Sequence, residues 1–277
     1  MSPLATPTAA NSLVFESYSC PACKQPLLAE SDRLHCANCP QTYPVVDGIP
    51  EFISGELSHS ADPVLRRMTA IDRMARIYET RLWYPLVLAA YGGFRRTSLK
   101  QLIATIARNV EGIEGRILDV ACGPGTYGRR IVSASREVFG IDVSRGMLRQ
   151  GIAYTASEGI GSMHFARARV EALPFAREFF DAALCCGSLH LFADTLAALR
   201  EVARVMKPGA ILSVFTFTDG AAGILKYRGA REWLRAKYGL HVFELPALEE
   251  TLDAAGFDSF APEVFGSILT FRARRKH

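Results

Sequence analysis

The stretch Arg116-Ile-Leu-Asp-Val-Ala-Cys-Gly-Pro-Gly125 decides the fold of this chain. Its first half is an apolar, β-branched run that predicts a buried strand, and its second half is a glycine turn. The next residues, Tyr127 to Ala134, have a helical pattern. Where a strand passes through a glycine turn into a helix, an α/β sheet brings backbone amides close to a ligand, because glycine lacks the Cβ that would block the approach. The stretch therefore predicts a ligand-binding edge of an α/β sheet.

Short apolar runs alternate with amphipathic segments from Arg116 onward. Further strands are predicted at Val138 to Ile141, Met163 to Ala166, Phe180 to Cys186 and Ile211 to Phe217, and further helices at Met147 to Ser157 and Thr195 to Met206. This alternation indicates a doubly wound, mostly parallel sheet with helices on both faces. The last apolar runs, within Asp258 to Arg274, predict an antiparallel edge.

The composition sets limits on the function. The chain has 277 residues, 49% of them hydrophobic, which is enough for one large domain and an appendage. Its net charge of +4 is small and its basic residues are scattered, with the densest cluster at Arg272 to Lys276, so the sequence does not indicate a dedicated nucleic-acid-binding face. No apolar run approaches the roughly 20 residues of a membrane span. Met1 to Asn11 lack the pattern of a secretory signal, and we expect a cytoplasmic protein.

Paired cysteines near the start of the chain predict a metal site. The metal ligands that we expect are Cys20, Cys23, Cys36 and Cys39. They form two Cys-x-x-Cys pairs separated by twelve residues, the spacing of a zinc ribbon in which four thiolates bind one tetrahedral ion. Four sulfur ligands leave no open position, which favours a structural role for the zinc. The surrounding short strands and the turn at Val46 to Pro50 are typical of a β-ribbon too small to fold without the metal.

A carboxylate lies at the end of the strand that follows the glycine turn. Val138-Phe-Gly-Ile-Asp142 places it about 20 residues after that turn, where it can accept hydrogen bonds from both hydroxyls of a ribose. Together with later landmarks, these residues resemble the class I S-adenosylmethionine-dependent methyltransferases from about Ile113 to the C-terminus. The landmarks are Leu118 to Gly125, Gly140 to Ser144 with Met147, Ala172 to Phe175, Phe180-Asp181, Glu201 to Gly209 and Ala255 to Phe257.

The resemblance implies a Rossmann-like, mostly parallel seven-stranded sheet and S-adenosylmethionine as cofactor. It also implies that Asp119 and the turn Gly123 to Gly125 hold the methionine end of the cofactor, Asp142 the ribose, and Met147 one face of the adenine. The cofactor-binding residues that we expect are Asp119, Ala121, Gly123, Gly125, Asp142, Val143, Met147, Val170, Glu171 and Cys186.

Two features complicate this interpretation. Gly123, Gly125 and Gly128 also satisfy the dinucleotide pattern G-x-G-x-x-G, but Pro124 lacks an amide donor for a pyrophosphate and the nearby Asp119 suits an amino group better than a phosphate. In addition, relatives commonly carry an Asp that accepts a hydrogen bond from the adenine amino group where this chain has Arg169. Arginine has no acceptor, so backbone carbonyls or Glu171 must replace that contact, or it is missing.

His190 is the candidate catalytic residue. It follows the strand Phe180 to Cys186 at the carboxyl edge of the sheet, and an imidazole can act as a general base near neutral pH. The alternative is that it only shapes the pocket. Cys185 and Cys186 are adjacent and point to opposite faces of a strand, so with Cys122 we interpret them as buried thiols rather than nucleophiles.

Two aromatic segments have two possible interpretations: they form a lid over the pocket, or their aromatic residues only pack a helix against the core. They are Tyr78 to Tyr84, ahead of the first strand, and Asp219 to Gly239, after the fifth. The ribbon resembles the small zinc-ribbon proteins that activate transfer-RNA methyltransferases, and similar ribbons are fused to bacterial enzymes that modify guanine in ribosomal RNA. Acidic residues outnumber basic ones around its cysteines, which disfavours RNA. We therefore expect the ribbon to pack on the catalytic domain and brace the lid.

The sequence thus predicts a methyltransferase that acts on O or C of a small, apolar or aromatic metabolite. RNA methylation and a non-methylating scaffold or cyclase are the alternatives. The predicted domains are a disordered or extended segment (1–17), the zinc ribbon (18–55), a helical linker and lid (56–112) and the cofactor-binding domain (113–277). The acceptor, the methylated atom and the oligomeric state cannot be predicted from the motifs.

Overall fold

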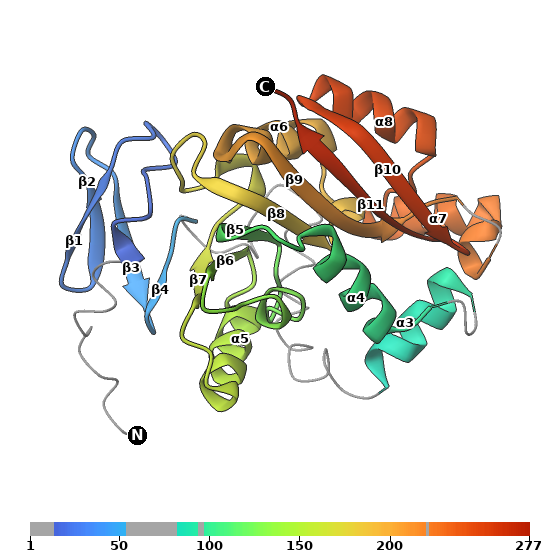
Figure 1. The fold of residues 1–277 in the computed structure, drawn as a ribbon, viewed down its shortest axis with the longest axis horizontal. Coiled ribbons are helices and arrows are strands. Elements are labelled where there is room, and N and C mark those ends of the chain that lie inside the picture. The colour runs from blue at the N-terminus through green and yellow to red at the C-terminus, as the bar shows by residue number, and fades with distance from the viewer. Residues whose placement is uncertain (1–13, 54–81, 94–96, 220–221) are drawn as a thin grey trace.

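The computed structural model describes residues 14–53, 82–93, 97–219 and 222–277. They form a small sheet near the N-terminus and a larger sheet covered by helices (Figure 1). Residues 1–13 and 54–81, which include most of the segment predicted as disordered and part of the predicted linker and lid, lie outside the described residues.

The N-terminal ribbon is a four-stranded antiparallel sheet. Its strands, in spatial as well as chain order, are β1 (Leu27–Glu30), β2 (Arg33–Cys36), β3 (Thr42–Val46) and β4 (Ile49–Pro50). Asp47 and Gly48 join the last two strands with φ angles of 54° and 79°, the left-handed conformation that a two-residue hairpin turn requires. Before the ribbon, Val14 and Phe15 begin a helical turn, and the side chain of Phe15 is buried, so the packed structure starts ahead of residue 18.

The larger sheet has seven strands in the order β10-β11-β9-β8-β5-β6-β7. Its parallel strands are β5 (Gly115–Val120), β6 (Arg136–Asp142), β7 (Met163–Arg167), β8 (Phe180–Cys186) and β9 (Met206–Phe217). The antiparallel edge consists of β10 (Phe257–Phe265) and β11 (Ile268–Arg275). Both the predicted Rossmann-like sheet and the antiparallel edge are confirmed.

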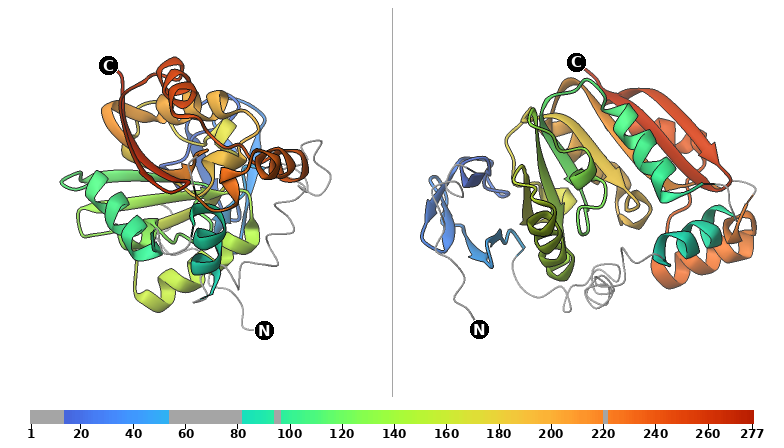
Figure 2. Two further views of the ribbon diagram at one scale, coloured as in Figure 1. Left: turned by 90° about the vertical axis from the view of Figure 1, so that its right-hand side faces the viewer. Right: turned by 60° about the horizontal axis from the view of Figure 1, so that its bottom comes forward.

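Helices cover both faces of this sheet (Figures 1 and 2). One face packs against α4 (Leu99–Asn109) and α5 (Arg145–Glu158), and the other against α6 (Thr195–Val205) and α8 (Leu245–Ala254). Alternate residues of a strand point to opposite sides, so consecutive apolar residues make both faces apolar. Ile117 packs with the α4 side, whereas Leu118 packs with the α6 side. Ser144 and Asp194 cap the N-termini of α5 and α6 by accepting backbone N–H bonds.

The helix predicted at Tyr127 to Ala134 is wrong. Only a single 3₁₀ turn, η3 (Gly128–Arg130), follows the glycine turn. The N–H groups of Arg130 and Ile131 donate to carbonyls three residues back, and the Ser133 hydroxyl then accepts the N–H of Ser135. Such side-chain bonds compete with helical hydrogen bonds and end the turn early.

The ribbon lies against the β7 edge of the larger sheet, at the opposite end of the molecule from α3 (Trp83–Gly92) and α7 (Arg228–Tyr238) (Figures 1 and 2). The Phe52 N–H donates to the Arg167 carbonyl at 2.8 Å, and the ring of Tyr18 packs against Phe139 and Phe175. The expectation that the ribbon braces the lid is wrong for the described residues, because their contacts are with β7, α5, α6 and the segment before β8.

Candidate cofactor and acceptor site

A cavity of about 590 Å³ lies at the carboxyl ends of the parallel strands, within the usual size range of ligand sites. Its walls come from the ends of β5, β6, β8 and β9, from the segment after β7, and from α3 and the end of α7. This is the edge at which the glycine turn was predicted to meet a ligand.

One end of the cavity is polar and organised around Asp142. Its carboxylate accepts the Gly123 N–H and the Ser144 N–H, both at 2.8 Å, so the side chain ties the glycine turn to the start of α5. Ala121 in that turn has a φ of 51°, an uncommon conformation for a residue other than glycine and one that recurs at functional sites. Two hydrogen bonds from amides fix the carboxylate before any ligand arrives.

Eight of the ten predicted cofactor residues line this cavity. They are Ala121, Gly123, Asp142, Val143, Met147, Val170, Glu171 and Cys186. Asp119 and Gly125 do not. The Asp119 carboxylate is buried beneath the turn and accepts the Gly128 N–H at 3.1 Å, and burial, with a contribution from Asp142, raises its pKa to about 7. The Cβ of a larger residue at Gly125 would meet the Met163 methyl at 2.7 Å, so this glycine serves close packing.

Arg169 is not one of the residues that line the cavity. Its Nε donates to a carboxylate oxygen of Glu171 at 3.3 Å, while Glu171 itself lines the cavity beside Val170. Of the replacements considered for the missing adenine acceptor, the Glu171 carboxylate is therefore present at the site. Its role in binding adenine stays a prediction.

The other end of the cavity is apolar and aromatic. The lining residues there are Trp83, Tyr84, Val87, Leu88, Tyr91, Leu191, Phe192, Phe215, Phe217, Tyr238 and Leu240. Among the described lining residues, the only Asp, Glu, Lys or Arg side chains are Asp142 and Glu171, both in the polar half. Sequence reasoning missed Phe215 and Phe217; their place at the carboxyl end of β9 was the available signal.

His190 lines the cavity between the two ends and is 5% exposed. Its Nδ1 lies 3.2 Å from the Thr216 hydroxyl, and its ring packs against that of Phe217. Burial, with a smaller effect of His241, lowers the pKa of His190 to about 3. The imidazole is therefore neutral near pH 7: it can accept a hydrogen bond, but it is a weak base and carries no resting positive charge.

The two cysteines at the end of β8 face opposite sides of the sheet, as predicted. Cys186 lines the cavity, whereas Cys185 packs on the α6 side and contacts the Ser188 hydroxyl at 3.4 Å. Burial raises the pKa of Cys185 to about 12 and that of Cys186 well above its ordinary value. Both are protonated thiols at neutral pH, which agrees with their interpretation as buried thiols.

The four ribbon cysteines come together as a metal site. Their sulfur atoms all lie within 4.8 Å of one another, and the pairs Cys20–Cys39, Cys23–Cys36 and Cys23–Cys39 are 3.7, 3.3 and 3.6 Å apart. Tetrahedral Zn–S bonds of about 2.3 Å place sulfurs about 3.8 Å apart, so the arrangement fits a structural Zn²⁺ with four thiolate ligands.

The polar end of the cavity is also connected to the ribbon. Glu51, 3% exposed, accepts hydrogen bonds from Arg145 at 2.7 Å and from Arg167 at 2.8 Å, and Arg167 donates in turn to the Val143 carbonyl at 2.9 Å. Burial alone would raise the pKa of Glu51, but the two guanidinium groups lower it below its ordinary value. Glu51 is one of the acidic ribbon residues that, in the sequence alone, serve only as evidence against RNA binding. In the structure it supports the segment from Asp142 to Met147.

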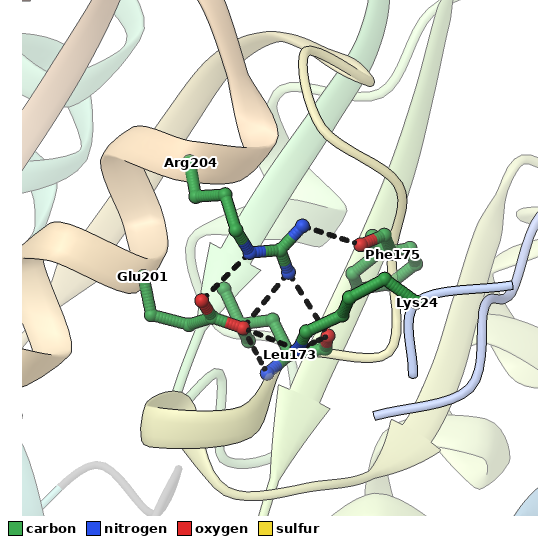
Figure 3. Close-up of polar contacts among 5 residues, drawn as sticks. All are labelled: Lys24, Leu173, Phe175, Glu201 and Arg204. Carbon is green, nitrogen blue, oxygen red and sulfur yellow. Dashed lines mark hydrogen bonds and ion pairs between the residues drawn. The ribbon is translucent and has the colours of Figure 1, made fainter. Parts of the chain in front are cut away.

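A second set of polar contacts joins the ribbon to the segment before β8 (Figure 3). Lys24 of the ribbon and Arg204 of α6 both bind the Glu201 carboxylate, at 2.9 and 2.7 Å. Glu201 also accepts the Leu173 N–H at 3.0 Å, and Arg204 donates to the carbonyls of Leu173 and Phe175. This set fixes the segment that continues from Val170 and Glu171 of the cavity wall.

Comparisons with known families agree with this arrangement. Residues 117–209 match the family model described as a methyltransferase domain, and residues 19–48 match that of the Trm112p-like proteins. The chain thus contains one region similar to methyltransferase domains and one similar to the Trm112p-like proteins. The landmarks quoted from the sequence fall largely within the first match, and the four cysteines fall within the second.

Individual relatives match part of the chain. The demethylmenaquinone methyltransferase of Corynebacterium kroppenstedtii is 36% identical over 107 residues, covering 37% of this chain and 42% of that protein. The malonyl-[acyl-carrier protein] O-methyltransferase of Pseudescherichia vulneris is 31% identical over 163 residues, covering 59% of this chain and 60% of that protein. The chain therefore spans about half the length of these curated relatives.

Solved structures share the fold at low identity. The [4+2]-cyclase SpnF superposes with a TM-score of 0.57 and 21% identity, covering 74% of this chain and 96% of that one. A chain from the complex of the Haloferax volcanii Trm112 methyltransferase activator with a putative methyltransferase gives a TM-score of 0.56 and 16% identity, covering 76% and 97%. The fold is thus shared by proteins named for different activities, so the function has to be inferred from the site.

Proposed function

We propose that the chain is an S-adenosylmethionine-dependent methyltransferase acting on an oxygen or carbon of a small, uncharged, apolar or aromatic acceptor. The observation that carries the proposal is the division of one cavity into a polar half around Asp142 and Glu171 and an aromatic half without a charged lining side chain among the described residues. Apolar walls with few polar groups suit a ring-shaped acceptor, whereas a carboxylate or phosphate acceptor would need a cation to pair with it.

The polar half offers hydrogen-bond acceptors for the ribose and the adenine of the cofactor. The fixed carboxylate of Asp142 would accept hydrogen bonds from the ribose hydroxyls, Met147 and Val170 would flank the adenine, and Glu171 would accept from its amino group. S-adenosylmethionine, when bound, supplies a sulfonium methyl that is already activated. The protein therefore contributes mainly alignment and exclusion of water.

The aromatic half would align the acceptor. Phe217 and Tyr91 stack on each other with centroids 5.1 Å apart and form one wall of the cavity, beside the neutral imidazole of His190. A neutral imidazole can accept a hydrogen bond from a hydroxyl of the acceptor and so orient its oxygen toward the methyl. With a pKa lowered to about 3, the ring is a weak base, and the proton that the hydroxyl loses on methylation would pass to solvent rather than stay on His190. Thr216, at His190 Nδ1, would hold the ring in place during that step.

The test is methyl transfer from tritiated S-adenosylmethionine to a panel of neutral phenols, hydroxyquinones and prenylated quinols, read as label extracted into organic solvent. We expect label in at least one ring acceptor and its loss in the Asp142→Asn variant. Transfer to ribosomal RNA with none to the panel would replace this proposal by the RNA alternative. Binding of S-adenosylhomocysteine without transfer to any acceptor class would favour the scaffold or cyclase alternative.

A further inference from the structure

Exposed apolar side chains are concentrated at the lid end of the molecule. Eight large apolar residues are exposed in the described chain, and six of them belong to α3, α7 and the turns that precede these helices. These six are Leu82, Leu86, Ile224, Tyr227, Trp233 and Tyr238. Scattered exposed apolar residues need no explanation, but a concentrated patch marks an interaction surface. We call α3, α7 and these turns the lid surface.

The lid surface also carries the net charge of the protein. Residues 224–238 contain five Lys or Arg and one acidic residue, an excess of four, and the net charge of the whole chain is +4. The remainder of the chain is therefore balanced, with equal numbers of basic and acidic residues. A partner that binds this surface by charge must be anionic.

Cations and aromatic rings of the lid surface are arranged together. The Lys237 ammonium lies 4.8 Å from the Trp233 ring centre and 5.4 Å from that of Tyr238, and the Lys226 ammonium lies 4.7 Å from that of Tyr227. Amphipathic rings beside long basic side chains are typical of the interface between lipid headgroups and acyl chains, where the ring enters the bilayer and the cation stays at the headgroups.

The neighbouring helix α3 favours lipid over nucleic acid. Its ten residues, Trp83–Gly92, include no charged side chain, and Leu82 and Leu86 at its start are 71% and 66% exposed. An RNA-binding surface would present donors to phosphates along its whole extent, whereas a bilayer surface accepts an apolar helix beside a basic one. No helix of the described residues is long and apolar enough to cross a membrane, so the protein would lie on the bilayer.

We propose that the lid surface docks the protein on an anionic lipid bilayer. Both helices of this surface also line the cavity, α3 through Trp83 and Tyr84 and α7 through Tyr238, so docking would place the aromatic end of the cavity against the membrane. Membrane docking by this surface does not depend on the proposed methyl transfer. If both hold, the acceptor reaches the cavity from the bilayer rather than from water.

The test is flotation of the full-length protein with vesicles of phosphatidylcholine alone or of phosphatidylcholine with phosphatidylglycerol. We expect binding only to the anionic vesicles, weakened by added salt. The double variant R235E/K237E should partition at least about 25-fold more weakly, because each basic residue near such a surface contributes about fivefold. The matched control R272E/R274E makes the same charge change on β11 and should float like the wild type.

A spectroscopic readout reports contact at the lid surface itself. The chain has two tryptophans, so in a Trp83→Phe background the emission comes from Trp233, which is 52% exposed. We expect a blue shift when anionic vesicles are added. Absence of flotation with anionic vesicles would overturn the proposal, as would equal loss in both charge-reversal variants. Salt-sensitive binding of RNA without vesicle binding would also overturn it and would assign the surface to nucleic acid.

Discussion

The ribbon end and the lid end of the molecule are built from opposite kinds of contact. At the ribbon end, buried carboxylates accept directed hydrogen bonds from guanidinium groups: Glu51 binds Arg145 and Arg167, and Arg167 holds the Val143 carbonyl. At the lid end, Trp83, Tyr91, Phe217 and Tyr238 line the cavity through apolar contacts. Directed charged hydrogen bonds fix one geometry, whereas apolar contacts have no direction. The difference suits a constant cofactor at one end and a variable acceptor at the other.

The largest effect should follow from breaking the metal site of the ribbon. Cys36→Ser removes one of four ligands, and we expect loss of zinc and of the ribbon fold, because structural zinc contributes on the order of 10 kcal/mol to folding in domains of this kind. Elemental analysis of the purified protein and limited proteolysis measure the two losses. Cys122→Ser is the matched control, since Cys122 is buried in the larger domain. Retention of one zinc per chain by Cys36→Ser would disprove the assignment.

The next largest effect should be on the free energy of unfolding, and it should differ between two acidic residues of the same ribbon. Glu51→Gln leaves Arg167 buried without its charge partner, and breaking a buried pair costs about 3 kcal/mol of unfolding free energy. Asp47→Asn removes an exposed pair with Arg149 and should cost less than about 1 kcal/mol. Denaturant unfolding compares them. Equal losses would mean that the ribbon interface has no special site at Glu51.

The pH dependence of stability should come from both ends of the molecule. His190 is protonated less readily in the folded state than in the unfolded state, so its contribution to stability is retained above pH 6.5 and is lost as the pH falls toward 3, by about 1.4 kcal/mol per unit. The raised pKa of Asp119 acts in the opposite direction below about pH 7, so the difference between wild type and a His190 variant isolates the His190 part. Glu51 and Glu201, whose pKa values are lowered by their Arg and Lys partners, add a loss below pH 4.5. Thermal unfolding of wild type and His190→Gln from pH 7.5 to 5 measures the first part. The same slope in both proteins would rule out a buried neutral His190.

The smallest effect should come from the lid. Tyr238→Ala removes a 41% exposed ring that also lines the cavity wall, and we expect the KM for the acceptor to rise about fivefold, with an unchanged KM for the cofactor. Tyr227→Ala is the control, because Tyr227 is exposed and absent from the cavity lining. Steady-state kinetics in the absence of lipid compares the two. A rise in the KM for the cofactor alone would mean that the cofactor, and not the acceptor, lies in the aromatic half of the cavity.

Sequence patterns predicted the features that depend on neighbouring residues and missed those that depend on contacts between distant parts of the chain. The strands and the Asp142 carboxylate follow from runs of neighbouring residues, and the two Cys-x-x-Cys pairs predict a metal site by spacing alone. The prediction of a helix after the glycine turn failed because the chain there forms only a 3₁₀ turn, after which the Ser133 hydroxyl accepts the Ser135 N–H. Glu51 and Arg167 are 116 positions apart, and no pattern in one sequence joins them. The aromatic half of the cavity likewise depends on segments that only the folded chain brings together.

The most direct test of the claim that the ribbon end supports the cofactor and the lid end the acceptor is calorimetric titration of the full-length protein with S-adenosylhomocysteine. The wild type should bind it, Glu51→Gln should bind about tenfold more weakly because the Val143 segment loses its support, and Tyr238→Ala should stay within twofold of the wild type. Failure of the wild type to bind at millimolar ligand, or a loss of affinity in Tyr238→Ala with none in Glu51→Gln, would contradict the account.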